Sequence, residues 1–237
     1  MKRDISLLIL CLIISVLCSS QIPAGYYYVA DGKKKSELKS YLSAIISQAQ
    51  MLNYGSGEGY TWQGFYFTDR NSDNSVVDMY SLVERFFPEN YGSVSGMHIE
   101  HSLPKSWWGA RQNNAYKDLF HLYPADGTTN ITKNNLPLGE AASPSFNNGM
   151  TKIGTNGFSY YLGKVFEPAD EFKGDFARSY LYMSTAYENF GMLGYWNSPM
   201  MNNNTYPVWQ KWAIDLLLKW HRQDPVSQKE KTRQEAV

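Results

Sequence analysis

Residues 97–139 read MHIEHSLPKSWWGARQNNAYKDLFHLYPADGTTNITKNNLPLG, and we expect the fold of the chain to be built around them. Met97–His101 alternates apolar and polar side chains, which predicts a short strand. Leu119–Tyr123 predicts a second strand. A turn then leads into a helix from Thr128, which Asp126 or Thr128 itself can cap. The stretch therefore predicts two strands followed by a helix.

The polar side chains of this stretch suit the hydrolysis of a phosphodiester with one divalent metal ion. Glu100 offers a hard oxygen ligand, and the adjacent His101 offers a base whose ordinary pKa lies near neutral pH. Asn130, Lys133 and Asn134 follow at spacings of three and four, so they share one face of the predicted helix.

Each of these residues also has a simpler reading. Strand alternation sends Glu100 and His101 to opposite sides, unless the strand ends or bulges there. A lone histidine is more often buried for structural reasons, and Glu100 could pair with Lys105 or Arg111. Asn130 could be a turn or capping asparagine. His98, three residues before His101, is interpreted as structural.

The order of motifs resembles the endonuclease I family of secreted and periplasmic bacterial nucleases, which carry a ββα-metal (His-Me) finger. The matching segments are Glu100-His101-Ser102-x-Pro104-Lys105-Ser106-Trp107, Asp118-Leu119-x-His121-Leu122-Tyr123-Pro124, and Asn130. Residues 78–81, 166–183 and 216–230 also look like the family, so the resemblance covers nearly the whole chain after its N-terminal segment.

The resemblance implies a role for each matching residue. His101 would be the general base, while Glu100 and Asn130 would hold one Mg²⁺, with Mn²⁺ or Ca²⁺ as substitutes. Lys133 would act beside the scissile phosphate, where the family often has arginine. The products would carry a 5′-phosphate. We expect further substrate contacts from three polar side chains, those of Lys105, Asn134 and Arg178. For Arg178 an ion pair with Asp175 or Glu171 is the open alternative.

The fold class expected from the whole chain is α+β, a mainly helical single domain built around the finger. Apolar spacing and turn residues predict helices at 33–53, 75–87, 174–190 and 208–222, a strand at 62–67, a loop at 136–157, and a helix that begins near Pro225. In the family the chain continues past this last helix. The domain, residues 21–237, is therefore expected to lack a C-terminal tail, which puts stability and activity in question.

The first twenty residues, MKRDISLLILCLIISVLCSS, have a basic start and an apolar run, as in a secretory signal peptide. The run is shorter than a transmembrane helix, so we expect a secreted or periplasmic protein without stable membrane insertion. Lipid anchoring at Cys18 is disfavoured by the bulky Leu17. Both cysteines, Cys11 and Cys18, lie here, so the cleaved chain has no disulfide or thiolate site.

The composition of the 237 residues is globular, with 19% charged and 15% aromatic residues and a formal net charge of zero. Neutrality does not favour a strongly basic nucleic-acid binder, although a local basic groove would suffice for phosphate contacts. The preferred function is a monomeric, largely nonspecific endonuclease acting on DNA, with RNA also open. The alternatives are an exported module that binds nucleic acid or polysaccharide without catalysis, and a phosphoesterase of small molecules.

Overall fold

The computed structural model describes residues 22–192, 196–202 and 206–237. The predicted signal peptide, residues 1–20, lies outside them. The helices and strands are η1 Tyr28–Ala30, α2 Lys35–Ile46, α3 Thr61–Thr68, β1 Met97–His101, η2 Lys105–Trp108, α4 Asn114–Lys117, β2 Leu122–Asp126, α5 Gly127–Lys133, β3 Ala141–Asn147, β4 Lys152–Asn156, β5 Lys164–Glu167, η3 Asp170–Phe172, α6 Lys173–Ala186, α7 Asn189–Met192, α8 Lys211–Gln223 and α9 Gln228–Ala236. Among these residues no helix is long and apolar enough to span a membrane.

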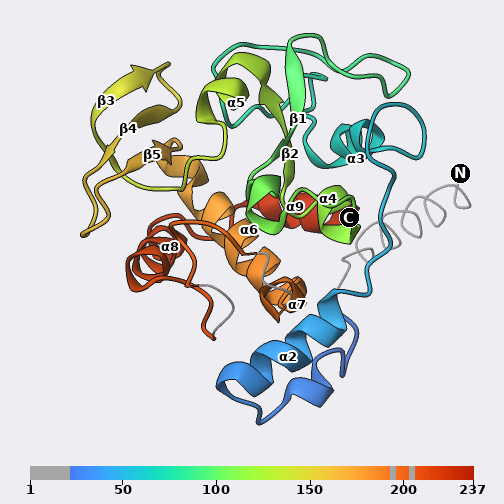
Figure 1. Ribbon diagram of the computed structural model, residues 1–237. Helices are drawn as coiled ribbons and strands as arrows, with labels where there is room; N and C mark the ends of the chain where they lie inside the picture. The colour runs from blue at the N-terminus through green and yellow to red at the C-terminus, as the bar shows by residue number, and fades with distance from the viewer. Residues whose placement is uncertain (1–21, 193–195, 203–205) are drawn as a thin grey trace, which may run out of the picture.

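Two small antiparallel sheets share the molecule with the helices, which makes the chain an α+β protein. One sheet is the pair β1–β2, and the other has the order β3-β4-β5 (Figure 1). Helices α6 and α8 pack against each other below them, and α2 projects at the far end of the molecule (Figure 1). Because the sheets contribute alongside the helices, the expected mainly helical character is not confirmed.

The main core lies where α6 and α8 meet the base of the β1–β2 pair. Phe176, Tyr180 and Met183 form the inner stripe of α6 and are completely buried, as their spacing predicts. Leu216 and Trp220 do the same for α8. Burial of these large apolar side chains supplies the main driving force for folding and holds β2 in place.

The predicted strand at 62–67 is wrong, because this segment is the helix α3. Its buried side chains, Trp62, Phe65 and Thr68, follow a spacing of three, which a short aromatic run cannot distinguish from alternation. Gly64 explains the close packing: a Cβ atom built there would lie 2.6 Å from Leu119 Cδ1.

The predicted helix at 75–87 is also wrong, because the segment folds back on itself as an irregular loop. An isolated bridge joins Ser75 to Phe86, and the carboxylate of Asp78 accepts the backbone N–H of Tyr80 at 2.9 Å. Such a local bond competes with helical hydrogen bonding. Met79 and Tyr80 still turn inward and are buried.

The predicted loop at 136–157 contains β3 and β4 instead. Pro144 lies in β3, an outer strand of its sheet, between Ala142 and Phe146, where the register shifts. An edge position with an irregular register tolerates a proline because no ladder hydrogen bond is lost. The second strand predicted at Leu119–Tyr123 corresponds to β2, which runs three residues later than predicted at both ends.

Candidate active site

The β1–β2 pair and α5 bring the sequence motif together. β1 lies antiparallel to β2 with Glu100 opposite Tyr123, and the chain passes from the end of β2 directly into α5. The side chain of Asp126 caps this helix by accepting the N–H of Thr129 at 2.7 Å. Arg85 holds the same carboxylate at 2.6 Å, so the start of α5 is fixed to the loop that contains Arg85.

A cavity of about 730 Å³ opens between β1 and α5. Its lining residues are Tyr54, Trp62, His98, Ile99, Glu100, His101, Pro104, Lys105, Ser106, Asn130, Ile131, Asn134 and Asn135. Five of the seven site residues expected from sequence line it together, namely Glu100, His101, Lys105, Asn130 and Asn134. Although Glu100 and His101 are neighbours in β1, both reach this cavity, because His101 is the last residue of the strand.

Glu100 has one occupied and one open carboxylate oxygen. Its Oε1 accepts hydrogen bonds from Lys133 Nζ at 2.7 Å and from the Tyr80 hydroxyl at 3.2 Å. Oε2 accepts no hydrogen bond from the described residues. It is also not fully buried. This oxygen is therefore available to a ligand in the cavity.

His101 is held as a neutral imidazole. Its side chain is 5% exposed, and its Nε2 lies 3.1 Å from the Tyr116 carbonyl, which can only accept. The ring proton is therefore on Nε2, and the Nδ1 lone pair is free of any bond within the described chain. Burial lowers the pKa of His101 to about 2, with His121 adding a smaller repulsion.

Aromatic rings fix the orientation of His101. Tyr54 stacks on it with ring centroids 5.5 Å apart, Tyr116 lies at 4.7 Å, and the edge of Trp108 lies at 6.1 Å. Tyr54 comes from a segment more than forty residues before His101, so its role was not visible from the motif.

Lys133 is not where the sequence placed it. We expected it beside a scissile phosphate, on one face with Asn130 and Asn134. Instead its side chain is completely buried, its ammonium group bonds to Glu100, and it does not line the cavity. The helix ends at Lys133, and Asn134 leaves it with a positive φ of 51°. Only the two asparagines therefore face the cavity, while the lysine turns inward.

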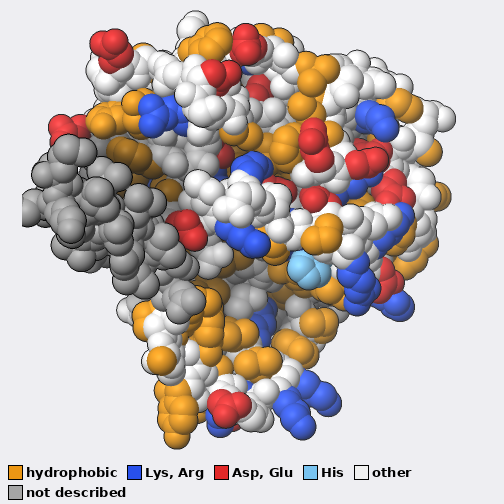
Figure 2. All heavy atoms as spheres, turned by 180° about the vertical axis from the view of Figure 1, so that it is seen from behind, with side chains coloured by type: hydrophobic (Ala, Val, Ile, Leu, Met, Phe, Trp, Pro, Cys, Tyr) orange, Lys and Arg blue, Asp and Glu red, His pale blue; other side chains and the backbone are white. Residues whose placement is uncertain are grey.

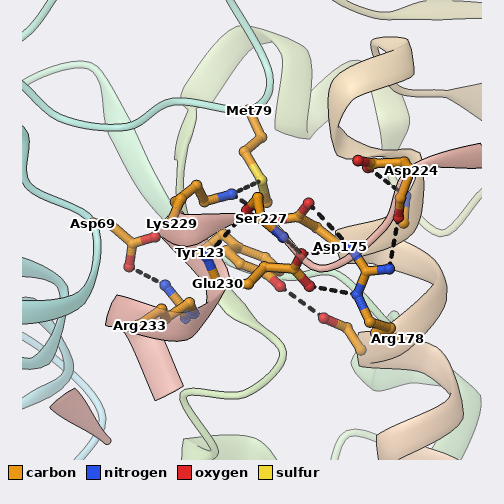
Figure 3. Close-up of polar contacts among 12 residues, drawn as sticks. Asp69, Met79, Tyr123, Asp175, Arg178, Asp224, Ser227, Lys229, Glu230 and Arg233 are labelled. Atoms are coloured by element: carbon orange, nitrogen blue, oxygen red, sulfur yellow. Dashed lines mark hydrogen bonds and ion pairs between the residues drawn. The ribbon is translucent and has the colours of Figure 1, made fainter. Parts of the chain in front are cut away.

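Arg178 is the second correction. Its guanidinium donates to both carboxylate oxygens of Glu230, at 2.5 and 2.6 Å, and to the Asp224 carbonyl at 2.7 Å (Figure 3). Asp175 lies 3.8 Å away, so one of the expected alternatives is partly confirmed. Arg178 does not line the cavity. Its hydrogen bonds connect α6 to Glu230 of α9.

Two further side chains of the site were missed. His98, interpreted as structural, is exposed and lines the cavity. Strand alternation could have found it, because His98 stands two residues before Glu100 and shares its face. A Cβ built at Gly127 would lie 3.1 Å from His98 Nε2, so glycine leaves room for the ring. Tyr80 is the second donor to Glu100. The sequence gives no sign of this contact, because the spacing at 75–87 indicates only a helix that packs on the core.

The donor set fits one hard divalent cation with few protein ligands. Glu100 and Asn130 line the same cavity, and neither Glu100 Oε2 nor the Asn130 side chain takes part in a hydrogen bond within the described chain. The described residues contain no cluster of three or more His, Cys, Asp or Glu side chains suited to a metal. Mg²⁺ binds through one or two protein oxygens and keeps several waters, which this pair would allow.

The cavity brings a carboxylate, an imidazole and an amide together, and comparisons with known proteins show the family to which the chain belongs. The chain belongs to the Endonuclease I family, because the model of that family matches residues 34–237. It is therefore a nuclease by family. It is 34% identical over 230 residues to an extracellular ribonuclease of Bacillus amyloliquefaciens, covering 94% of this chain and 74% of that protein. It is 33% identical over 219 residues to an extracellular ribonuclease of Bacillus subtilis (strain 168), covering 90% and 70%.

Acid should destabilise this protein through its buried histidines. His121 is completely buried, donates from Nε2 to the Ala115 carbonyl at 2.7 Å, and leaves its Nδ1 without a partner. Burial lowers the pKa of His121 to about 4. The unfolded chain takes up a proton near pH 6.5 that the folded chain refuses, so stability is retained above pH 6.5 and falls as the pH drops towards 4.

We expect His121→Gln to make the free energy of unfolding less dependent on pH, because the variant takes up one proton fewer on unfolding. Between pH 6 and 5 the free energy of unfolding of the parent should fall more steeply than that of the variant, by about 1.4 kcal/mol per pH unit. Urea denaturation at several pH values measures both slopes. Leu119→Ala removes buried apolar surface without removing a titratable group and should keep the parental slope. Equal slopes in the parent and His121→Gln would contradict the prediction.

Proposed function

We propose that this protein is a secreted, metal-dependent endonuclease that hydrolyses phosphodiester bonds of DNA or RNA with little sequence preference. The observation that carries the proposal is that Glu100, His101 and Asn130 meet at one cavity. Glu100 supplies a carboxylate ligand, His101 a base and Asn130 an amide ligand in the space where a phosphodiester would lie. In this proposal β1, β2 and α5 form the ββα-metal finger.

His101 would take a proton from the attacking water at Nδ1. Its neutral ring has the lone pair that this step needs, and the Tyr116 carbonyl that accepts Nε2–H stabilises the ring once it becomes charged. A base in hydrogen-bonding reach of its water typically contributes a factor of about 10² to 10⁴ in rate. Packing by Tyr54 and Tyr116 holds the ring so that Nε2 stays on the Tyr116 carbonyl and Nδ1 points away from it.

Glu100 and Asn130 would hold the metal ion, with Mg²⁺ as the proposed cofactor and Mn²⁺ or Ca²⁺ as substitutes. When bound, Mg²⁺ supplies Lewis-acid stabilisation of the charge on the phosphate and on the leaving 3′ oxygen. The products would then carry a 5′-phosphate and a 3′-hydroxyl. Lys133 would not touch the phosphate; it would hold Glu100 in place from behind.

Substrate binding would depend on few charged contacts. Lys105 is exposed at the cavity, with its ammonium 5.3 Å from the centre of the Tyr116 ring, and Asn134 lies across the same cavity. The face drawn in Figure 2 carries acidic and basic side chains interspersed rather than gathered by sign. With contacts mainly to the backbone of the nucleic acid, cleavage should tolerate most sequences. A monomer would suffice for this mechanism.

Secretion is proposed from the first twenty residues and from the relatives, both of which are described as extracellular. The names of these relatives also make RNA a substrate to test beside DNA. A periplasmic location is open in the same proposal, and lipid anchoring is the less favoured one.

The test is cleavage of supercoiled plasmid and of a structured RNA by the mature protein, with Mg²⁺ and with EDTA. We expect nicking that EDTA abolishes. Asn130→Ala should slow it about tenfold or more at limiting Mg²⁺, because one of two protein ligands is lost. The matched control Asn189→Ala lies at an exposed position of α7, away from the cavity-lining residues, and should cleave as the parent does. Binding of nucleic acid by a folded sample that never cleaves it would favour the non-catalytic module instead.

A further inference from the structure

The two donors to Glu100 both bind the same carboxylate oxygen. Lys133 Nζ lies 2.7 Å and the Tyr80 hydroxyl 3.2 Å from Oε1, whereas Oε2 has no donor from the described chain and Glu100 itself lines the cavity. A carboxylate held in this way has only one oxygen to offer a metal ion. The asymmetry comes from the core side of the site and not from the cavity side.

Lys133 cannot release this oxygen. Its side chain is completely buried, and its other polar neighbour is the Ser102 carbonyl at 3.4 Å, which Tyr180 already uses at 2.7 Å. The ring of Phe166 lies 5.7 Å from the ammonium. A buried ammonium without a counter-charge is very costly, so Glu100 Oε1 must remain its partner.

Tyr80 is equally fixed. It is completely buried, and its ring stacks on Phe166 with centroids 5.3 Å apart. Its backbone carbonyl accepts from Asn148 at 2.8 Å and its N–H donates to Asp78, so the residue is held on both sides. The hydroxyl therefore reaches Glu100 from a rigid position.

We propose that Lys133 and Tyr80 determine which cation the site accepts, by restricting Glu100 to a single ligand oxygen. The inference rests on the proposed metal site and adds its selectivity: small octahedral ions such as Mg²⁺ and Mn²⁺ bind in preference to Ca²⁺. Lys133 and Tyr80 are positioning residues here, since they act through Glu100.

The coordination habits of the ions give the reason. Mg²⁺ and Mn²⁺ accept one carboxylate oxygen and fill the remaining positions with water or phosphate oxygens, whereas Ca²⁺ takes six to eight oxygens and often binds a carboxylate through both of them. Lys133 also cancels the charge of Glu100, which weakens binding of every divalent ion. A site with one available oxygen and no net charge penalises the larger ion most, because that ion relies on more protein oxygens.

The test is competition for bound Mn²⁺, followed by the EPR signal of the free ion in the mature protein without nucleic acid. In the parent, Mg²⁺ should displace Mn²⁺ at a lower concentration than Ca²⁺ does. Lys133→Met removes the charged donor of Oε1 and leaves only the longer contact from the Tyr80 hydroxyl, so we expect Ca²⁺ to bind about tenfold tighter and Mg²⁺ to gain less. Tyr80→Phe should shift the ratio in the same direction by about two- to threefold, because Oε1 then loses only its neutral donor.

Two control variants distinguish a change in metal selectivity from a general effect of charge and from a wrongly placed metal site. Lys105→Met removes an exposed charge at the same cavity but leaves both donors of Oε1, so it should change both affinities alike and keep their ratio. If Lys133→Met does not fold, as judged by circular dichroism, Tyr80→Phe decides alone. An unchanged ratio in the folded variants would overturn the inference and leave the proposed function intact. If the parent takes up no Mn²⁺, or if Glu100→Gln binds it equally well, the proposed metal site itself is wrong.

Discussion

His101→Ala is expected to slow plasmid nicking by about 10² to 10⁴-fold, the usual contribution of a general base. The Nδ1 lone pair of the imidazole is free of any hydrogen bond within the described chain, since Nε2 donates to the Tyr116 carbonyl. Single-turnover cleavage at saturating Mg²⁺ measures the effect on the chemical step. Affinity for Mg²⁺ should change little, because Glu100 and Asn130 remain.

Chemical rescue distinguishes a lost base from a damaged site. Removal of the ring leaves space beside Tyr54 and Tyr116, so added imidazole should restore part of the cleavage rate. His221→Ala removes an exposed histidine that does not line the cavity and should cleave as the parent does. Undiminished cleavage by a folded His101→Ala protein would show that the base has been misassigned.

Arg233→Met is expected to lower the free energy of unfolding by about 3–5 kcal/mol, the usual cost of breaking a buried ion pair. Arg233 is 5% exposed and lies in α9, where its guanidinium pairs with Asp69 at the end of α3 (Figure 3). It also donates to the carbonyls of Leu119 and Leu122, the latter at 2.5 Å. The substitution would leave a buried carboxylate unpaired and two carbonyls without their donor.

Thermal and urea unfolding measure this loss, which should lower the melting temperature by roughly 10 °C in a chain of this size. Lys231→Met, on an exposed position of the same helix, should stay within about 0.5 kcal/mol of the parent. Adding Asp69→Asn to Arg233→Met should recover part of the stability, because the unpaired charge is removed. If Arg233→Met costs no more than Lys231→Met, α9 does not anchor β2 as the contacts indicate.

The arrangement of β1, β2 and α5 was predictable because its information is local. Glu100, His101 and Asn130 lie within a short stretch of chain, and the pairing of two adjacent strands followed directly by a helix allows few arrangements. Strand and helix periods also identify which side chains share a face, and the strand period places His98 on the same face as Glu100.

Predictions failed where distant segments compete for the same residues. Trp62 and Phe65 of α3 pack in a cluster with Leu119 and Leu122, some sixty residues away, and this packing selects helix over strand. The Asp78 carboxylate binds the N–H of Tyr80 and of Asp126, which prevents the expected helix at 75–87. The packing of α3 on Leu119 and Leu122, and the bond from Asp126 to Asp78, cannot be read from the periodicity of either segment.

The local sequence was enough to bring a glutamate, a histidine and an asparagine to one cavity, because two strands and a helix that follow one another along the chain carry them. The partners of the cationic side chains depended instead on contacts between distant segments. Lys133 pairs with Glu100, Arg178 with Glu230 and Arg233 with Asp69, so none of the three guanidinium or ammonium groups points into the cavity. The physical reason is that a buried charge must find its counter-charge, and that partner is fixed by packing between distant helices rather than by spacing along the chain.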